Sequence, residues 1–193
     1  MSPAAVPLDA LLWGLLGSVV LPLWLLAGLA DYWAHARSDI AHTAGLHESA
    51  LHLLQTAQIG VPVLLVLLAR INALTLAVLI LGVAAHTVTA YRDVRYAAAR
   101  RHISPFEQFV HNFLNVLPLA ALAIVIVLHW PAFQALLALA EAPPNAWTLQ
   151  WREPPFERAV IAAVLVASLL FGLLPGVIEF VRTLAARPPA GSR

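Results

Sequence analysis

Cysteine and lysine are both absent from this chain of 193 residues. Without cysteine there is no disulfide framework, no thiolate metal site and no cysteine nucleophile, so a bound metal must be held by His, Asp and Glu. Charged residues make up only 11% of the sequence, whereas a soluble domain contains about a quarter. The net charge of +1 gives no indication of a nucleic-acid partner.

The chain contains long runs of uncharged residues. Hydrophobic residues make up 61% of the chain, and the mean hydropathy is +0.83. A helix needs about 20 apolar residues to cross a bilayer, and lipid cannot satisfy free backbone groups. The sequence therefore predicts an all-α, polytopic helical bundle, a single membrane domain over residues 1–193. We expect its five transmembrane helices at about 9–30, 50–69, 73–90, 106–129 and 159–181.

Arginine is distributed unevenly between the two sides of these spans. The stretches 31–49 and 91–105 and the C-terminal tail share one side, which carries eight arginines, and the opposite side carries three. The positive-inside rule places the first side in the cytoplasm. We therefore expect an integral protein of the bacterial inner membrane, with its N-terminus outside and its C-terminus cytoplasmic. Within 91–105, Arg92, Arg95, Arg100 and Arg101 are expected to bind lipid phosphates or to fix the topology.

Ionisable residues gather at the cytoplasmic ends of the predicted spans. A carboxylate precedes a histidine by four residues three times, in Asp31 and His35, Glu48 and His52, and Glu107 and His111. Residues four apart share a helix face, so each pair can aim one oxygen and one nitrogen at the same point. The predicted metal ligands are Asp31, His35, Glu48, His52, His86, Asp93, Glu107 and His111, with His42, His47 and Glu179 as weaker candidates. The alternative is a solvated polar rim. His129 lies at the far end and is expected to be an interfacial anchor.

The types of ligand restrict the choice of metal. Oxygen and nitrogen ligands without sulfur suit iron, manganese or zinc. The number of candidates exceeds what one tetrahedral zinc site needs, which favours two metal ions. Ferritin-like di-iron proteins also collect such ligands from four helices. We therefore expect two iron ions, with zinc as the alternative.

Over residues 31–111 the pattern resembles, at the level of motifs, the membrane-bound histidine-box di-iron enzymes of the fatty-acid desaturase and hydroxylase class. The shared features are helical spans, a cytoplasmic ligand cluster and ligands at i, i+4 positions. The chain has neither the His-x-x-x-His nor the His-x-x-His-His box of that class. The resemblance implies an oxidoreductase or oxygenase that acts on a lipid or another apolar substrate, with membrane lipids and an electron donor as partners.

Two other functions remain open at this point. A zinc-dependent membrane hydrolase of lipids needs about three histidines, a metal-activated water and a carboxylate base, and Glu48 or Glu107 is a candidate for that base. A membrane protein that binds haem or metal ions is the other alternative. The sequence contains no Walker loop, no Rossmann fingerprint and no nucleophile elbow.

Overall fold

The structure is a computed structural model that describes residues 6–186. Eight α-helices occur in this range, together with two π-helical segments, Leu16–Val20 and Ser168–Leu173, and a 3-10 turn, Ile40–His42. The helices are α1 (Leu8–Leu15), α2 (Leu21–Arg37), α3 (Gly45–Leu68), α4 (Ala73–Ala98), α5 (Pro105–Leu128), α6 (Trp130–Leu136), α7 (Arg158–Ala167) and α8 (Leu174–Ala185). Arg187 and Arg193, two of the eight arginines counted on the cytoplasmic side, lie outside the described residues.

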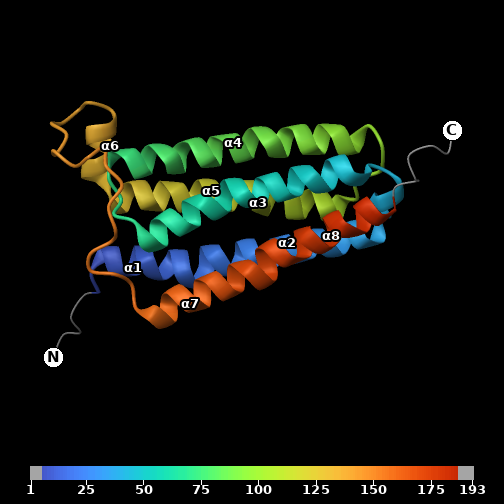
Figure 1. Cartoon of the computed structure of the whole chain (residues 1–193), viewed down its shortest axis with the longest axis horizontal. Helices are drawn as coiled ribbons and strands as arrows, with labels where there is room; N and C mark the ends of the chain where they lie inside the picture. Colours follow the sequence, from blue (N-terminus) through green and yellow to red (C-terminus); the bar gives the residue numbers. More distant parts are fainter. Residues whose placement is uncertain (1–5, 187–193) are drawn as a thin grey trace.

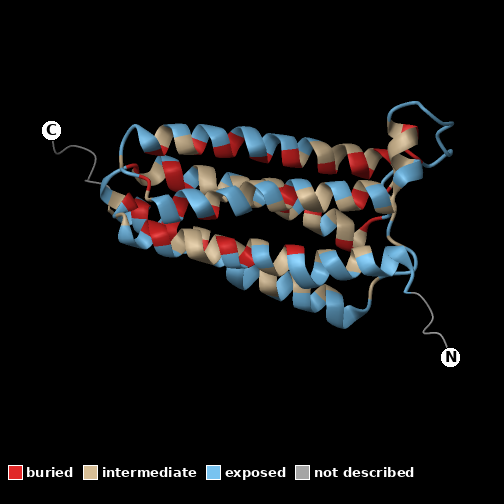
Figure 2. Ribbon diagram, turned by 180° about the vertical axis from the view of Figure 1, so that it is seen from behind, coloured by how far each residue is buried: buried red, intermediate tan, exposed pale blue. Residues whose placement is uncertain are grey.

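Five continuous helices are long and apolar enough to cross a membrane. They are Leu8–Arg37, Gly45–Leu68, Ala73–Ala98, Pro105–Leu128 and Arg158–Ala185. Their outward faces carry exposed apolar side chains such as Leu81, Val127 and Val166, and Figure 2 shows that exposed residues cover most of the outside of the bundle. Apolar surface of this extent is suited to lipid rather than water. The predicted all-α membrane bundle is therefore confirmed.

The helices run farther than the hydropathy pattern predicts. The first span continues through Asp31 and His35 to Arg37, and the third continues past Ala90 to Ala98. The predicted polar stretches after these spans, 31–49 and 91–105, thus begin as helix. The additional turns contain Asp31, His35 and Asp93, whose side chains face charged groups on other helices.

Capping side chains fix where two of the spans begin. Asn72 accepts a hydrogen bond from the Thr75 backbone N–H, and the Thr75 hydroxyl accepts one from the Asn72 backbone. This reciprocal capping box starts α4 directly after the short turn that follows α3. Ser104 caps α5 by accepting from the Glu107 backbone N–H, which fixes Glu107 in the first helical turn.

The helices form an elongated bundle with the connections at its two ends (Figure 1). α3 packs against α4 and α8, and α2 packs against α5. α6 and the following loop lie at the end where α1 begins, whereas α8 ends at the opposite end. α7 diverges from α3 toward the α1 end. The space between them is important for the cavities described below.

Each π-helical segment ends two residues before a proline, Pro22 in one case and Pro175 in the other. Proline has no N–H, and its ring clashes with the carbonyl four residues earlier, so the preceding turn widens. In the second case the Phe171 carbonyl approaches α2 at Gly28, where a built Cβ would lie 3.8 Å from that oxygen. The widened turn therefore lies against α2 in the middle of the bundle.

Candidate metal centre

Five helices bring eight polar side chains together at the α8 end of the bundle. We call this set the polar cluster; it consists of Asp31 and His35 from α2, Glu48 and His52 from α3, Asp93 from α4, Glu107 and His111 from α5, and Glu179 from α8. His35, Glu48 and Glu107 are only 1% exposed. Buried charges need compensation, so this is not the solvated rim that the sequence left open.

Four members of the polar cluster surround one point. One ligand atom from each of Asp31, His35, Glu107 and His111 lies within 4.8 Å of the others. The Nε2 atom of His35 lies 3.2 Å from Glu107 and 3.5 Å from Asp31, and the Nε2 atom of His111 lies 3.0 Å from Asp31. Ligand atoms about 2.1 Å from a common metal ion lie about 3.0–3.4 Å apart. The spacing is therefore that of a ligand set.

Hydrogen bonding does not account for these close approaches. The Oδ1 atom of Asp31 and the Nε2 atom of His35 are buried, and neither has a hydrogen-bond partner among residues 6–186. Buried polar atoms are nearly always paired. Two buried atoms 3.5 Å apart without hydrogen-bond partners call for a proton or a metal ion between them.

A second group forms around His52. One ligand atom from each of His35, Glu48 and His52 lies within 4.8 Å of the others. The Nε2 atom of His52 lies 3.0 Å from Oδ2 of Asp93 and, among the described residues, also has no hydrogen-bond partner. Gln55 donates a hydrogen bond of 3.1 Å to the same Asp93 oxygen and so fixes that carboxylate.

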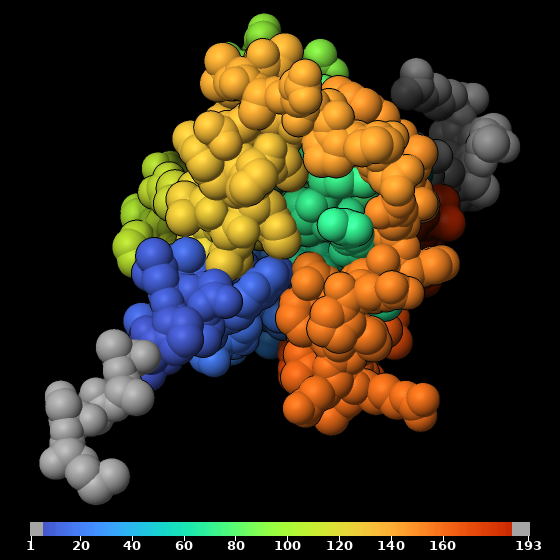
Figure 3. All heavy atoms as spheres, turned by 90° about the vertical axis from the view of Figure 1, so that its left-hand side faces the viewer, coloured from blue at the N-terminus to red at the C-terminus, as the bar shows by residue number. Residues whose placement is uncertain are grey.

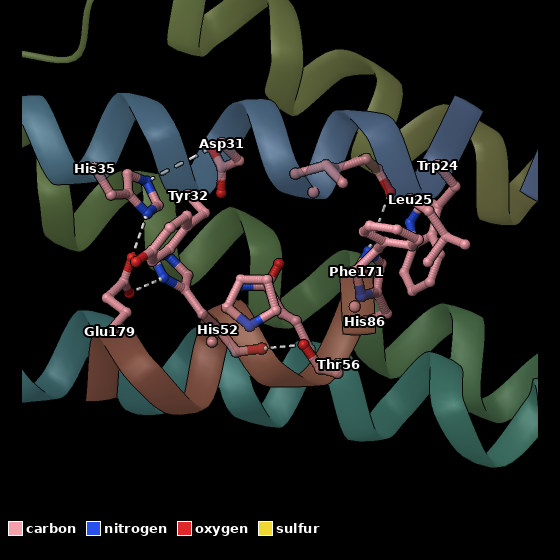
Figure 4. A pocket seen from close by; sticks show the side chains of 16 residues that line it. Trp24, Leu25, Asp31, Tyr32, His35, His52, Thr56, His86, Phe171 and Glu179 are labelled. Atoms are coloured by element: carbon pink, nitrogen blue, oxygen red, sulfur yellow. Dashed lines mark hydrogen bonds and ion pairs between the residues drawn. The ribbon is translucent and has the colours of Figure 1, made fainter. Parts of the chain in front are cut away.

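Glu179 connects the two groups by contacting a histidine of each at Nδ1, the ring nitrogen that does not face the other ligands. Its two oxygens lie 2.9 Å from Nδ1 of His35 and 2.8 Å from Nδ1 of His52, and the two imidazole rings stack with centroids 4.5 Å apart. If each neutral ring carries its proton on Nδ1, the Nε2 lone pair is available to a metal. Glu179 is thus placed to orient two ligands, as carboxylates behind metal-binding histidines do. Dashed lines in Figure 4 join Glu179 to both rings.

Arg101 lies among these side chains, which corrects the expectation that it contacts lipid phosphates. Its guanidinium donates to both carboxylate oxygens of Glu48 and to Glu107, and its side chain is 2% exposed. Burial alone would lower the pKa of Arg101, but the hydrogen bonds to Glu107 and Glu48 raise the pKa above its usual value. The neighbouring Arg100 is exposed and stacks on Tyr96.

The charges of this site do not balance. Five carboxylates and one guanidinium leave four net negative charges when the imidazoles are neutral. Uncompensated charges in a low-dielectric interior are strongly unfavourable. The site therefore requires further cations, either protons on the imidazoles or bound metal ions.

Three predicted ligands lie apart from the polar cluster. His42 is exposed and pairs with Asp39 at 2.7 Å. His47 is exposed and packs on Tyr96. His86 is buried, but its Nε2 atom lies 3.3 Å from the Leu114 carbonyl. His86 precedes Asp93 by seven residues and is hence about 10 Å away from it along α4. His129 lies at the opposite end of the bundle, against Trp13.

The polar cluster borders a cavity of about 90 Å³, which we call the cluster cavity. Asp31, His35, His52 and Glu179 line one end of it, and His86 lines the other end together with Trp24. The Nδ1 atom of His86 has no hydrogen-bond partner within the described part of the chain. A small cavity with polar side chains at both ends therefore lies directly beside the candidate ligands.

Comparisons with known proteins identify no relative. No protein-family model, curated protein or solved structure matches the chain. A function must therefore be inferred from the side chains themselves.

Proposed function

We propose that this protein is a membrane-embedded di-iron oxidoreductase that oxygenates an apolar substrate. The observation that carries the proposal is the charge of the polar cluster, because two divalent cations would cancel its four net negative charges. One zinc ion would leave half of that charge uncompensated in a buried site. The comparatively large number of oxygen ligands also suits iron better than a four-coordinate zinc site.

Each ion would have its own ligands. Asp31, His35, Glu107 and His111 would hold the first. His52 and Asp93, with Glu48 beside them, would hold the second. Glu179 would keep the Nε2 atoms of His35 and His52 directed toward the ions, and Arg101 would limit the negative charge on Glu48 and Glu107.

Such a centre supplies the chemistry of oxygen activation. In the proposed reaction one atom of O₂ enters a C–H bond of the substrate, and the other is reduced to water by two electrons and two protons from an electron donor. The protein's own contribution is to arrange the ligands and to exclude bulk water with the apolar walls around them. Membrane lipids would surround the bundle, and the polar cluster would face the bacterial cytoplasm.

Metal analysis tests this function most directly. We expect two iron ions per chain after purification in detergent without added metal. His111→Ala and His52→Ala should each lower the metal content, and His42→Ala, which removes an exposed histidine outside the cluster, should leave it unchanged.

The outcomes separate the alternatives. If the protein contains one zinc ion per chain and no iron, the zinc-dependent lipid hydrolase replaces the proposed oxygenase. A wild-type protein that binds no iron or zinc at micromolar concentrations would mean that protons balance the site and that it is an ionic network. Iron content without any oxygen-dependent product from membrane lipids would leave a metal-binding protein instead of an oxygenase.

A further inference from the structure

A second cavity lies farther along the bundle and shares Trp24 with the cluster cavity. Its volume is about 370 Å³, and apolar residues from α1 to α5 and α7 line it. We call it the apolar cavity. A cavity of about 150 Å³ holds one benzene molecule, so this one has room for roughly fifteen carbon atoms. That is one hydrocarbon chain of ordinary length and less than the two chains of a phospholipid.

The two cavities follow one face of the N-terminal helix. Trp24 lines both of them. The lining residues of this helix recur three or four positions apart, as Trp13, Gly17, Val20, Trp24, Gly28, Asp31 and His35. Because that spacing keeps them on one face, the two cavities lie one after the other along this helix, with Trp24 between the apolar cavity and the polar cluster. Trp13 and Trp24 are about 16 Å apart at 1.5 Å per residue.

A cationic group lies at the far end of the apolar cavity. Trp13 and Phe156 line that end, and the Arg152 guanidinium lies 5.3 Å from the Trp13 ring and 4.3 Å from the Phe156 ring. Figure 3 views this end, with α1 and the segment leading into α7 lying beside each other. The Arg152 guanidinium therefore lies beside aromatic rings at this end of the apolar cavity.

Arg152 has no anionic partner in the described range of residues 6–186. It donates to the Val66 carbonyl at 3.0 Å, but it forms no salt bridge there, and its Nε atom is buried without a hydrogen-bond partner. Burial lowers the pKa of Arg152. Burial and the charge of Arg152 together lower the pKa of the neighbouring His129. Among the described residues Arg152 thus has no anionic partner, although Asp9, Glu153 and Glu157 belong to the same end of the bundle.

We infer that the apolar cavity binds a single-chain fatty acid, with its carboxylate at Arg152 and the end of its chain toward the polar cluster. Guanidinium groups bind carboxylates through two parallel hydrogen bonds, and Nε is one of the donors still free here. The reverse orientation would bring the carboxylate to a site with excess negative charge. As the substrate of the oxygenase, a role that rests on the proposed function, such a molecule would present the carbons farthest from its carboxylate.

Fluorescence quenching by bromine tests the orientation, because bromine quenches only nearby tryptophans. The probes are hexadecanoic acid with bromine on carbon 2 or on carbon 16, added to the chelated wild-type protein in detergent. We expect Trp24→Phe to remove most of the quenching by the carbon-16 probe, and Trp13→Phe to remove most of the quenching by the carbon-2 probe. Trp33→Phe, which changes an exposed tryptophan on α2, should alter neither.

The same titrations test the carboxylate site. Arg152→Gln should weaken binding of the acid at least tenfold, and Arg158→Gln, an exposed arginine at the same end, should not. The methyl ester of the acid should bind the wild type as weakly as the acid binds Arg152→Gln, which tests the charge even when that variant fails to fold.

Several results would overturn the inference. They are equal quenching of both tryptophans by both probes, an exchange of the two assignments, or equal affinity for acid and ester. Fatty-acid binding is measured after chelation, and metal content is measured separately. A negative result in one measurement therefore does not affect the other. Fatty-acid binding without stoichiometric metal would defeat the proposed function alone, and stoichiometric metal without fatty-acid binding would defeat this inference alone.

Discussion

At the scale of single residues, four of the five carboxylates of the site have three different surroundings. Asp31 and Asp93 each face the Nε2 atom of a histidine. Glu107 faces both a histidine and a guanidinium. Glu179 contacts only Nδ1 atoms. Substitutions of these residues should therefore have different effects, although all remove one carboxylate.

Glu179→Gln should weaken metal binding without changing its stoichiometry. The amide keeps one acceptor oxygen for the two Nδ1–H groups that Glu179 now serves, so one imidazole loses its orientation. Loss of such a supporting residue reduces metal affinity about 10- to 100-fold. Competition titrations against a chelator give the affinity, and metal analysis at saturation gives the stoichiometry. Loss of one ion at saturation would instead make Glu179 a direct ligand.

Arg101→Gln should destabilise the protein strongly. The change leaves Glu48 and Glu107 buried without their guanidinium partner, and breaking a buried ion pair costs about 3–5 kcal/mol. Arg100→Gln is the matched control, because Arg100 is exposed and single surface substitutions stay within about 0.5 kcal/mol. Unfolding in mixed detergent measures both. Equal stabilities of the two variants would contradict the buried role of Arg101.

The sequence predicted much of the site but missed this arginine. The pairs around His35, His52 and His111 could be recognised because helical spacing brings residues i and i+4 to one face. Arg101 lies between helices, where no periodicity indicates its direction. The orienting position of Glu179 depends on the packing of α8 against α3, and local spacing contains no information about that contact.

At the scale of helices, α3 and α4 approach most tightly where a glycine meets a proline. A Cβ built on Gly82 would lie 2.8 Å from a ring carbon of Pro62 and 2.9 Å from the Gln58 carbonyl oxygen. Gly172 and Gly176 have the spacing of four that is typical of close helix packing, but they are less crowded. A built Cβ at those positions would come no closer than 3.3 Å to its neighbours.

Gly82→Ala should destabilise the bundle by about 1–3 kcal/mol, the usual range for overpacking. Gly60→Ala, on α3, adds the same methyl group to a position with no neighbouring atom within 4 Å, and should change the stability by at most about 1 kcal/mol in either direction. Thermal unfolding of both variants in the same detergent measures the difference. If Gly60→Ala destabilises the protein more than Gly82→Ala does, the contact between α3 and α4 is not as described.

The positions of the spans were predictable, and their ends were not. Gaps between charges mark where hydrocarbon surrounds a helix, so all five spans were located. The additional turns of the first and third spans contain Asp31, His35 and Asp93, which lie beyond the apolar runs that mark the predicted spans. These residues remain inside the bundle because they face charged groups on other helices, a tertiary effect that a single segment cannot reveal.

At the scale of the whole molecule, the distribution of arginine predicts the orientation. The polar cluster and the end of α8 share one side of the bundle, and positive-inside places that side in the cytoplasm. A reporter fused after Arg193 should therefore be active only if it folds in the cytoplasm. Activity of a periplasmic reporter at the same position would reverse the orientation.

Removing the metal should loosen the entire bundle, because the candidate ligands come from four helices besides α8. Binding energy of ligands from separate helices is also folding energy. We expect chelation to lower the melting temperature of the wild type, and to lower that of His111→Ala by less. A melting temperature that does not respond to chelator in either protein would mean that no metal joins the helices.

The first helix is longer than the hydrocarbon of a bilayer is thick, and this affects how reactants would reach the polar cluster. Thirty residues, Leu8–Arg37, extend about 45 Å at 1.5 Å per residue, whereas the hydrocarbon of a bilayer is about 30 Å thick. Asp31 and His35 lie in the last two turns, so a bilayer centred on the apolar part of the helix would bring them to the depth of the lipid headgroups. Under the proposed function, a water-soluble electron carrier would then dock on the membrane surface directly above the site, and an oily chain would reach the same site from below.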